Sequence, residues 1–280
     1  MGTQQLATII IAITVLCTAF FLGNTTYPKS TIIQEQQKAI TINSLLTQAE
    51  TALTPAQKNH ATHLQQELTQ ASSDTAKLRV YNELLQFWGG ELRNDEIAVW
   101  YVAEKAKLEK SEKNITFAAN LILNNVIGNN TDVAKRGFKA NVAKELYEQA
   151  ILLNQNSDSL QIGLGTCYMY GAGGSNPMEG IAKVLGISKR DTTNAYAHKM
   201  LGYGNLQNGS TDKALDRFIK AYTYNTADSE LVPYIALLSK KLGKNDTAQF
   251  WYNKTKELMQ KNKELFQAFD KEYQASAINK

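Results

Sequence analysis

The chain has 280 residues, of which 43% are hydrophobic, and its formal net charge is +4 at pH 7. This length accommodates one or two domains with a substantial core. The charge is mild and by itself gives no indication of a nucleic-acid partner. The two cysteines, Cys17 and Cys167, are far apart in the sequence, which excludes a disulfide framework and the cysteine spacing of a zinc site.

A short N-terminal tail, residues 1–5, precedes an uncharged apolar stretch, residues 6–23, with the sequence LATIIIAITVLCTAFFLG. A helix of this length just crosses a hydrocarbon core of roughly 30 Å. The tail carries no Lys or Arg, and no clear Ala-x-Ala site follows the stretch, so a retained transmembrane anchor is favoured over a signal peptide. Leu16, directly before Cys17, argues against a lipoprotein. The sequence therefore predicts a single-pass membrane protein.

The side of the membrane on which the rest of the chain lies follows from the flanking charges. Lys29 and Lys38 come after the apolar stretch, and nothing basic precedes it. The positive-inside rule then favours a C-terminal domain that faces the cytoplasm, and the periplasm is the alternative.

The chain between the apolar stretch and the first repeat is expected to be helical. Residues 24–53 are interpreted as a juxtamembrane helical linker, and residues 54–111 as a helical region without a repeat pattern. Thr54 and Pro55 mark a helix start, because Thr is a good N-cap and Pro suits the first helical position. The other boundaries predicted in this region are N-caps at Asp74 and Asp95 and a break at Gly89–Gly90.

The C-terminal half contains an internal repeat with a period of 34 residues. Residues 195–228 align with residues 229–262 without a gap. The equivalent pairs are Leu201 and Ile235, Gly202 and Ala236, Gly209 and Gly243, Ala214 and Ala248, and Phe218 and Tyr252. Apolar residues recur every three to four positions and no segment alternates as a strand does, so the period predicts pairs of α-helices.

This pattern resembles the tetratricopeptide repeat (TPR), a pair of helices with small residues where the two helices cross, a glycine after the first helix and an aromatic residue in the second. The resemblance implies an all-α solenoid of helical hairpins. The whole chain also resembles small membrane-anchored TPR proteins of Bacteroidetes, which implies a bacterial protein behind its N-terminal transmembrane helix.

The resemblance extends upstream to residue 112 and divides the rest of the chain into units. These are a divergent repeat with a long turn (112–157), a repeat with a three-residue insertion in its turn (158–194), and two regular repeats (195–228 and 229–262). Residues 263–280 are expected to form the C-terminal capping helix that such a stack needs.

The glycine-rich stretch GAGGSNPMEG, residues 171–180, has the composition of a phosphate-binding loop. It lacks the Lys-Ser or Lys-Thr of a P-loop, its G-x-G-x-x-G pattern breaks at Asn176, and a predicted helix precedes it. The inserted residues of the repeat 158–194 fall in this stretch. We therefore interpret it as an enlarged turn between two helices, with Pro177 in the first turn of the second helix.

TPR arrays bind partners along a concave groove formed by their first helices, and the resemblance implies such a groove here. The residues that it places in the groove are Ile162, Thr166, Met169, Tyr170, Tyr196, Lys199, Tyr203, Leu206, Gln207, Leu237, Lys240 and Lys241. A groove of this composition suits an amphipathic or extended peptide. The implied function is a non-catalytic scaffold or adaptor that holds a protein or peptide partner at the membrane and uses no cofactor or metal.

Two alternatives stay open. The first is a periplasmic accessory factor for protein secretion or for the assembly of a cofactor or complex. The second is a metal- or thiol-dependent enzyme, for which the candidates are His60 and His63, with Glu67 on the same helix face, and Cys167. Three ligands on one helix are a weak zinc signal, and a lone cysteine beside apolar residues is usually buried, so a non-enzyme is favoured. His198 is expected to pack in the core.

Overall fold

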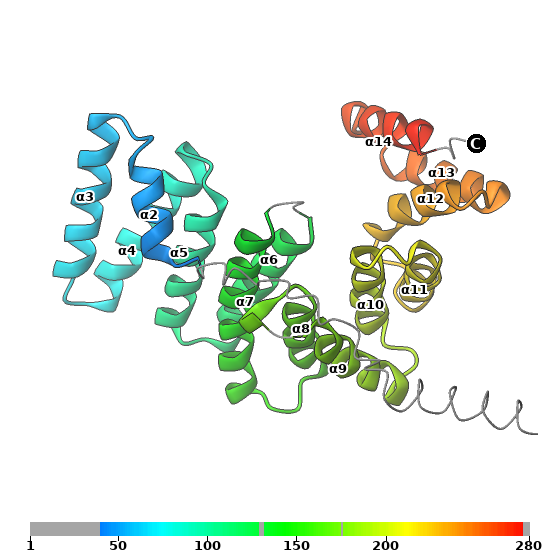
Figure 1. Ribbon diagram of the computed structural model, residues 1–280, viewed down its shortest axis with the longest axis horizontal. Coiled ribbons are helices and arrows are strands. Elements are labelled where there is room, and N and C mark those ends of the chain that lie inside the picture. The colour runs from blue at the N-terminus through cyan, green and yellow to red at the C-terminus, as the bar shows by residue number, and fades with distance from the viewer. Residues whose placement is uncertain (1–39, 129–131, 175, 277–280) are drawn as a thin grey trace, which may run out of the picture. The chain divides into compact units, whose positions relative to one another are not determined.

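A computed structural model describes residues 40–128, 132–174 and 176–276. These residues form thirteen α-helices, a π-helix and a short 3-10 helix, and they contain no strand (Figure 1). The expected all-α class is therefore confirmed for this part of the chain.

The helices divide into an N-terminal group and a group of successive pairs. The N-terminal group comprises α2 (Ile42–Glu50), α3 (Pro55–Gln70), α4 (Asp74–Leu85), the π-helix η1 (Gln86–Glu91) and α5 (Asp95–Glu109). The pairs are α6 (Glu112–Gly128) with α7 (Val133–Leu153), α8 (Asp158–Met169) with α9 (Pro177–Arg190), α10 (Ala195–Gln207) with α11 (Thr211–Tyr224), and α12 (Leu231–Lys241) with α13 (Asn245–Leu258). The 3-10 helix η2 (Ala172–Gly174) lies between α8 and α9, and α14 (Lys263–Ala275) follows the last pair.

The helix starts in the N-terminal group follow capping chemistry. Helix α3 begins as predicted, with Thr54 as its N-cap and Pro55 as its first residue. In α4 and α5 the N-caps are Ser73 and Asn94, one residue before the predicted aspartates. The aspartates occupy the first turn instead, where a negative charge is favourable at a helix N-terminus.

The predicted break at Gly89–Gly90 is a π-helix, η1, that continues directly from α4. A Cβ atom at Gly89 would lie 3.1 Å from the Cβ of Ala98, so glycine allows η1 to approach α5 closely. Trp88 in this segment is buried. Gly89 thus serves a close helix contact rather than a chain break.

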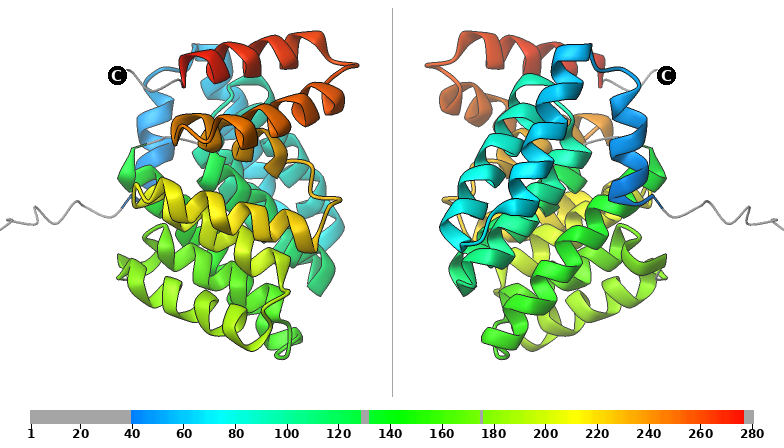
Figure 2. Two further views of the ribbon diagram at one scale, coloured as in Figure 1. Left: turned by 90° about the vertical axis from the view of Figure 1, so that its right-hand side faces the viewer. Right: turned by 90° about the vertical axis from the view of Figure 1, so that its left-hand side faces the viewer.

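The four pairs are stacked so that their first helices are neighbours. Helix α8 contacts both α6 and α10, and α12 contacts α14 (Figures 1 and 2). We call the surface formed by α6, α8, α10 and α12 the first-helix face. This arrangement is consistent with a helical solenoid.

Small residues are sterically required where the two helices of a pair cross. A Cβ atom at Gly180 would lie 2.3 Å from the carbonyl oxygen of Gly165, and one at Gly202 would lie 2.5 Å from the ring of Phe218. The spacing of small residues in the sequence therefore indicates where the two helices of a pair cross.

The glycine-rich stretch is a turn between α8 and α9, as expected. Gly171, Gly173 and Gly174 have φ angles of 90°, 68° and 64°, which an L-residue rarely adopts. Pro177 is the first residue of α9. The backbone N–H of Gly173 also donates a hydrogen bond to Asn141 of α7, which ties the turn to the preceding pair.

The pair α6 and α7 differs from the expected long turn. Helix α6 has 17 residues and α7 has 21, and only residues 129–132 separate them. Asp132 starts α7 early, because its side chain accepts hydrogen bonds from the backbone N–H groups of Ala134 and Lys135. The residues that follow Asp132 therefore belong to α7 rather than to a turn.

The core consists of two hydrophobic clusters. The larger one extends from α2 to α12. The smaller one is formed by Ala236, Ala248, Phe269 and Tyr273. Helix α14 contributes the two aromatic residues of the smaller cluster, and the Tyr252 ring of α13 lies 4.6 Å from that of Tyr273. Residues 263–275 thus cover the end of the stack, as a capping helix does.

The predicted membrane localisation needs correction. In the part of the chain that the structure describes, no helix combines the length and apolar character that a membrane crossing requires. The single-pass localisation, with its cytoplasm-facing C-terminal domain, is overturned by this finding and is not retained. The apolar stretch 6–23 on which it rested lies outside the described residues, as do residues 1–5 and most of the expected linker.

Candidate functional site

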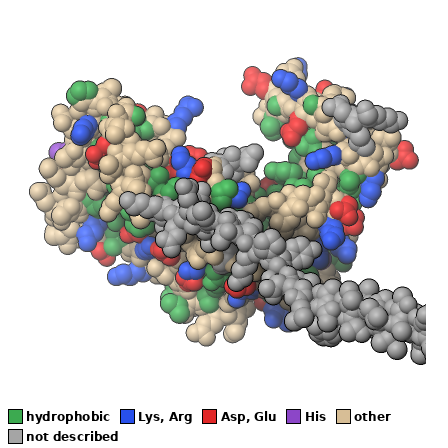
Figure 3. Space-filling model, viewed as in Figure 1, with side chains coloured by type: hydrophobic (Ala, Val, Ile, Leu, Met, Phe, Trp, Pro, Cys, Tyr) green, Lys and Arg blue, Asp and Glu red, His purple; other side chains and the backbone are tan. Residues whose placement is uncertain are grey.

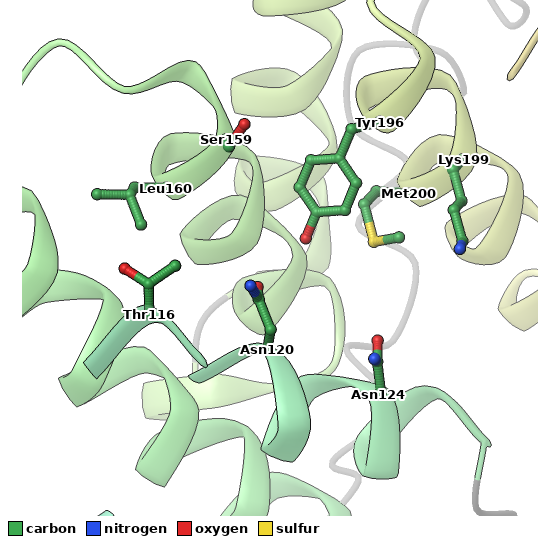
Figure 4. Close-up of a pocket in the computed structure, with 8 residues that line it drawn as sticks. All are labelled: Thr116, Asn120, Asn124, Ser159, Leu160, Tyr196, Lys199 and Met200. Carbon is green, nitrogen blue, oxygen red and sulfur yellow. The ribbon is translucent and has the colours of Figure 1, made fainter. Parts of the chain in front are cut away.

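Three successive first helices line a pocket of about 340 Å³, which we call the asparagine pocket (Figure 4). Its residues are Thr116, Asn120 and Asn124 of α6, Ser159 and Leu160 of α8, and Tyr196, Lys199 and Met200 of α10. Because the pocket crosses three helix pairs, a ligand bound in it would contact all three.

The α6 wall of this pocket is polar and regular. Thr116, Asn120 and Asn124 are four residues apart, so they share one face of the helix. Both asparagines are exposed, and the hydroxyl of Tyr147 donates a hydrogen bond of 2.6 Å to the Asn120 carboxamide oxygen. Sequence reasoning missed these residues, because groove positions were assigned only to the later repeats. The four-residue spacing of the asparagines was the available signal.

Lys199, on the α10 wall, has two carboxylate partners. Its ammonium lies 2.9 Å from Oδ2 of Asp228 and 2.8 Å from Oε2 of Glu230. The hydroxyl of Tyr203 donates a hydrogen bond of 2.8 Å to the other oxygen of Glu230. These contacts join α10 to the segment that leads into α12.

The ionisation of this group is set by burial and by these hydrogen bonds. Burial alone would lower the pKa of Lys199, but the hydrogen bonds to Glu230 and Asp228 outweigh it and raise the pKa. Burial alone would raise the pKa of Glu230, but the bonds from Lys199 and Tyr203 lower it. The lysine and the glutamate therefore stay charged together at neutral pH.

A second pocket on the first-helix face, of about 260 Å³, is rich in tyrosine. We call it the tyrosine pocket. Its residues are Val126, Ile127 and Gly128 of α6, Arg136 of α7, Tyr170, the α10 residues Tyr203, Leu206 and Gln207, and Tyr234 of α12. A third pocket, the C-terminal pocket, has about 330 Å³ and is lined by Pro233, Tyr234, Leu237, Met259, Leu265, Ala268, Phe269 and Glu272. Tyr234 lines both, so the two pockets adjoin.

The structure divides the predicted groove residues by exposure. Five of them are buried, namely Ile162, Thr166, Met169, Tyr170 and Tyr203. Tyr170 and Tyr203 nevertheless line the tyrosine pocket. Thr166 donates its hydroxyl hydrogen bond to the backbone oxygen of Ile162, 2.8 Å away, within its own helix. A binding role for these five stays a prediction.

The other predicted residues lie closer to solvent. Tyr196 and Lys199 line the asparagine pocket, Leu206 and Gln207 the tyrosine pocket, and Leu237 the C-terminal pocket. The Lys240 ammonium lies 5.5 Å from the centre of the Tyr273 ring, and Lys241 is exposed. The binding role of each also stays a prediction.

The residues considered for metal or thiol chemistry lie apart. The His60 ring packs edge-on against Phe87, with ring centres 5.1 Å apart, and His63 lies 3.9 Å from Glu67. Within the described residues no group of three or more His, Cys, Asp or Glu side chains is arranged to hold a metal ion. Burial raises the pKa of the Cys167 thiol well above its usual range, so the nucleophilic thiolate is disfavoured.

His198 is a packed residue, as expected. Its Nε2 lies 3.0 Å from the backbone oxygen of Thr192, and its Nδ1 lies 2.9 Å from a guanidinium nitrogen of Arg217. The ring stacks on Tyr224 with centres 5.8 Å apart. With an Arg donating to Nδ1, the imidazole is neutral and carries its proton on Nε2.

One face of the molecule carries charges of both signs. On the face seen in Figure 3, the coloured Lys and Arg side chains alternate with Asp and Glu side chains.

The described residues thus define an all-helical protein of stacked helix pairs with pockets on its first-helix face, consistent with a TPR-like fold. No protein-family model matches the chain. The chain is similar to the BBSome complex member BBS4 of Mus musculus, with 31% identity over 100 residues, which are 36% of this chain and 18% of the mouse protein. For the Bos taurus protein of the same name, the identity is 30% over 105 residues, 38% of this chain and 20% of the bovine protein.

The chain therefore matches about a fifth of the length of these curated relatives. The similarity is thus to a short part of a member of a protein complex. It gives no support to the resemblance to membrane-anchored proteins of Bacteroidetes or to a bacterial origin.

Proposed function

We propose that this chain is a non-catalytic scaffold or adaptor that binds a peptide segment of a partner protein along its first-helix face. The observation that carries the proposal is the asparagine pocket, because three successive helix pairs contribute to it. Similarity to a member of a named complex adds support. Within the described residues, nothing favours the periplasmic accessory role or the enzymatic alternative over this one.

The spacing of the polar residues on α6 fits an extended peptide. Residues four apart on a helix are separated by about 6 Å along its axis, and alternate residues of an extended chain by about 6.5 Å. A peptide parallel to α6 would therefore place every second peptide group beside Thr116, Asn120 or Asn124. A carboxamide offers both a donor and an acceptor to such a group.

The opposite walls of the pocket provide apolar surface for the side chains of the peptide. Leu160 comes from α8, and Tyr196 and Met200 from α10 (Figure 4). Aromatic rings and methionine are enriched at protein interfaces and adapt to different partners. The backbone contacts would supply orientation and the apolar contacts affinity.

The experiment is a selection of random twelve-residue peptides against the immobilised full-length chain, followed by affinity measurements on the enriched peptides. The test variant is Asn124→Ala, because this exposed side chain lines the pocket and has no hydrogen bond within the described residues. The matched control is Asn82→Ala, an exposed asparagine of α4 outside the first-helix face. We expect the test variant to bind selected peptides about tenfold more weakly and the control to bind as the native chain does.

Two results would count against the proposal. If Asn124→Ala and Asn82→Ala bind every selected peptide equally well, the peptide site lies elsewhere. If no peptide is enriched at all, peptide binding itself fails as the function. Thermal unfolding of both variants establishes that they are folded.

A further inference from the structure

Three cationic side chains, Lys135, Arg136 and Lys139, lie near the N-terminus of α7. This is the unfavourable end of a helix for a positive charge. The ammonium groups of Lys135 and Lys139 lie 3.5 Å and 3.6 Å from the two carboxylate oxygens of Glu96. Arg136 forms no ion pair within the described residues. Arg136 is therefore the one of the three that has no carboxylate partner among the described residues, while Lys135 and Lys139 share the single charge of Glu96.

Arg136 also has an unused hydrogen-bond donor. Its Nε atom is buried and has no hydrogen-bond partner within the described residues. A buried donor without a partner is destabilising, and more so when the group is charged. Folding therefore leaves at this position a charge and a donor that a ligand would satisfy.

Arg136 belongs to the wall of a pocket. Arg136 lines the tyrosine pocket together with Tyr170, Tyr203 and Tyr234. Burial raises the pKa of Tyr170 to about 12, and the charge of Arg136 opposes this rise. Tyr170 is therefore a neutral hydroxyl donor close to the guanidinium. The Tyr203 hydroxyl, by contrast, already donates to Glu230.

The cation that lines the asparagine pocket is in a different state. Lys199 in the asparagine pocket is neutralised by Asp228 and Glu230. A negative ligand would compete with these two carboxylates at Lys199, but it would meet no such competitor at Arg136. Charge complementarity thus places an anionic group in the tyrosine pocket.

We propose that the tyrosine pocket binds the carboxylate of an Asp or Glu side chain of the partner peptide, with Arg136 as counter-ion and the Tyr170 hydroxyl as a second donor. This inference rests on the proposed function, since the peptide lies along the first-helix face. Tyr234 lines both the tyrosine pocket and the C-terminal pocket. A peptide that occupies both pockets would run past Arg136, which fits a side-chain carboxylate rather than a chain terminus.

The test uses the same peptide selection, carried out with the full-length chain and with three variants. Arg136→Gln removes the charge, Arg136→Glu reverses it, and Arg79→Gln is the control. Arg79 is an exposed arginine of α4 that pairs with Glu67 and Glu83, so the control loses the same charge far along the chain from the pocket.

We expect the native chain and Arg79→Gln to enrich Asp or Glu at one fixed position of the peptide. Arg136→Gln should bind these peptides about tenfold more weakly. It should bind their Asn or Gln counterparts as well as the native chain does. Arg136→Glu should enrich Lys or Arg at the same position. Amidation of the peptide C-terminus should leave binding unchanged.

The inference is overturned if Arg136→Glu keeps the acidic preference, if the native chain enriches peptides without any acidic position, or if amidation abolishes binding. Each of these results leaves the proposed function standing, because peptides still bind. The absence of any enriched peptide would instead count against the proposed function together with this inference. Unchanged thermal unfolding of Arg136→Gln separates lost recognition from lost folding.

Discussion

Lys199 and Glu230 are 31 residues apart in the sequence, yet the ammonium of one lies 2.8 Å from a carboxylate oxygen of the other. This contact joins two successive helix pairs, and Asp228 and Tyr203 extend it. In a repeat protein, stability depends on such contacts between neighbours as well as on each repeat. Here part of that coupling is ionic.

Replacing the lysine should weaken this coupling. We expect Lys199→Met to lower the free energy of unfolding by about 1–2 kcal/mol, because two carboxylates lose their hydrogen-bonded cation. Urea unfolding measures the change. Lys241→Met, at an exposed lysine that forms no ion pair with another described residue, is the control and should stay close to the native value. Equal losses in the two variants would show that the ionic contact adds no stability.

The crossing of α8 and α9 should not accept even one methyl group. At Gly180 a Cβ atom would meet backbone atoms at 2.3 Å and 2.7 Å, and backbone cannot move aside cheaply. We expect Gly180→Ala to lower the free energy of unfolding by about 3 kcal/mol. Circular dichroism during thermal unfolding would record a lower midpoint.

Gly186 lies in α9, as Gly180 does, but there we expect alanine to be stabilising. A Cβ atom there meets nothing within 4 Å. Gly186→Ala should therefore stabilise the protein by about 0.5–1 kcal/mol, because alanine favours the helix. A native-like Gly180→Ala would mean that the two helices are further apart than described.

Stability should depend on pH through His198. Its pKa is lowered from the usual 6.5, first because burial disfavours the cation and further because of the nearby charges of Arg217 and Lys220; the bond to Thr192 and the charge of Asp191 oppose this. Between the lowered pKa and 6.5 the unfolded chain binds more protons than the folded one, so stability falls as the pH is lowered through this window. Above pH 6.5 the full stability of the protein is present.

The measurement is urea unfolding at a series of pH values from about 7.5 to about 5. His198→Asn should flatten the pH dependence in this range. His63→Asn, which replaces a largely exposed histidine, is the control variant. A native-like slope in His198→Asn would assign the dependence to other groups.

The capping helix should detach without unfolding the whole stack. Phe269→Ala removes one of the two aromatic residues that α14 places in the smaller cluster. We expect the free energy of unfolding of this end of the stack to fall by about 3 kcal/mol, with no change elsewhere. Hydrogen exchange would show lost protection in α14 and retained protection in α6 to α9. Uniform loss of protection along the chain would contradict this expectation.

The regular part of the fold was predictable because it rests on local signals. The 34-residue period, the positive φ angles of Gly209 and Gly243 and the glycine turn before Pro177 all correspond to features visible in the sequence. Each of these glycines is needed by the backbone at its own position, so neighbouring residues suffice to recognise it.

The site was less predictable because it depends on distant contacts. The partners of Lys199 lie at and just before the start of the following repeat, and no spacing rule predicts them. Ile162 and Met169 are buried because first helices approach each other closely, which a list of groove positions does not show. Asn124 and Arg136 belong to the divergent pair, whose helices are longer than the repeat pattern predicts.

Helix α12 takes part in both hydrophobic clusters, since Ile235 belongs to the larger one and Ala236 to the smaller. A force applied at the C-terminus would therefore reach the smaller cluster first and peel α14 and α13 away while α12 still covers the larger core. In a single-molecule pulling experiment the chain should lengthen in two separate steps. Under load, α13 and α14 would unfold first and leave the tyrosine and asparagine pockets intact.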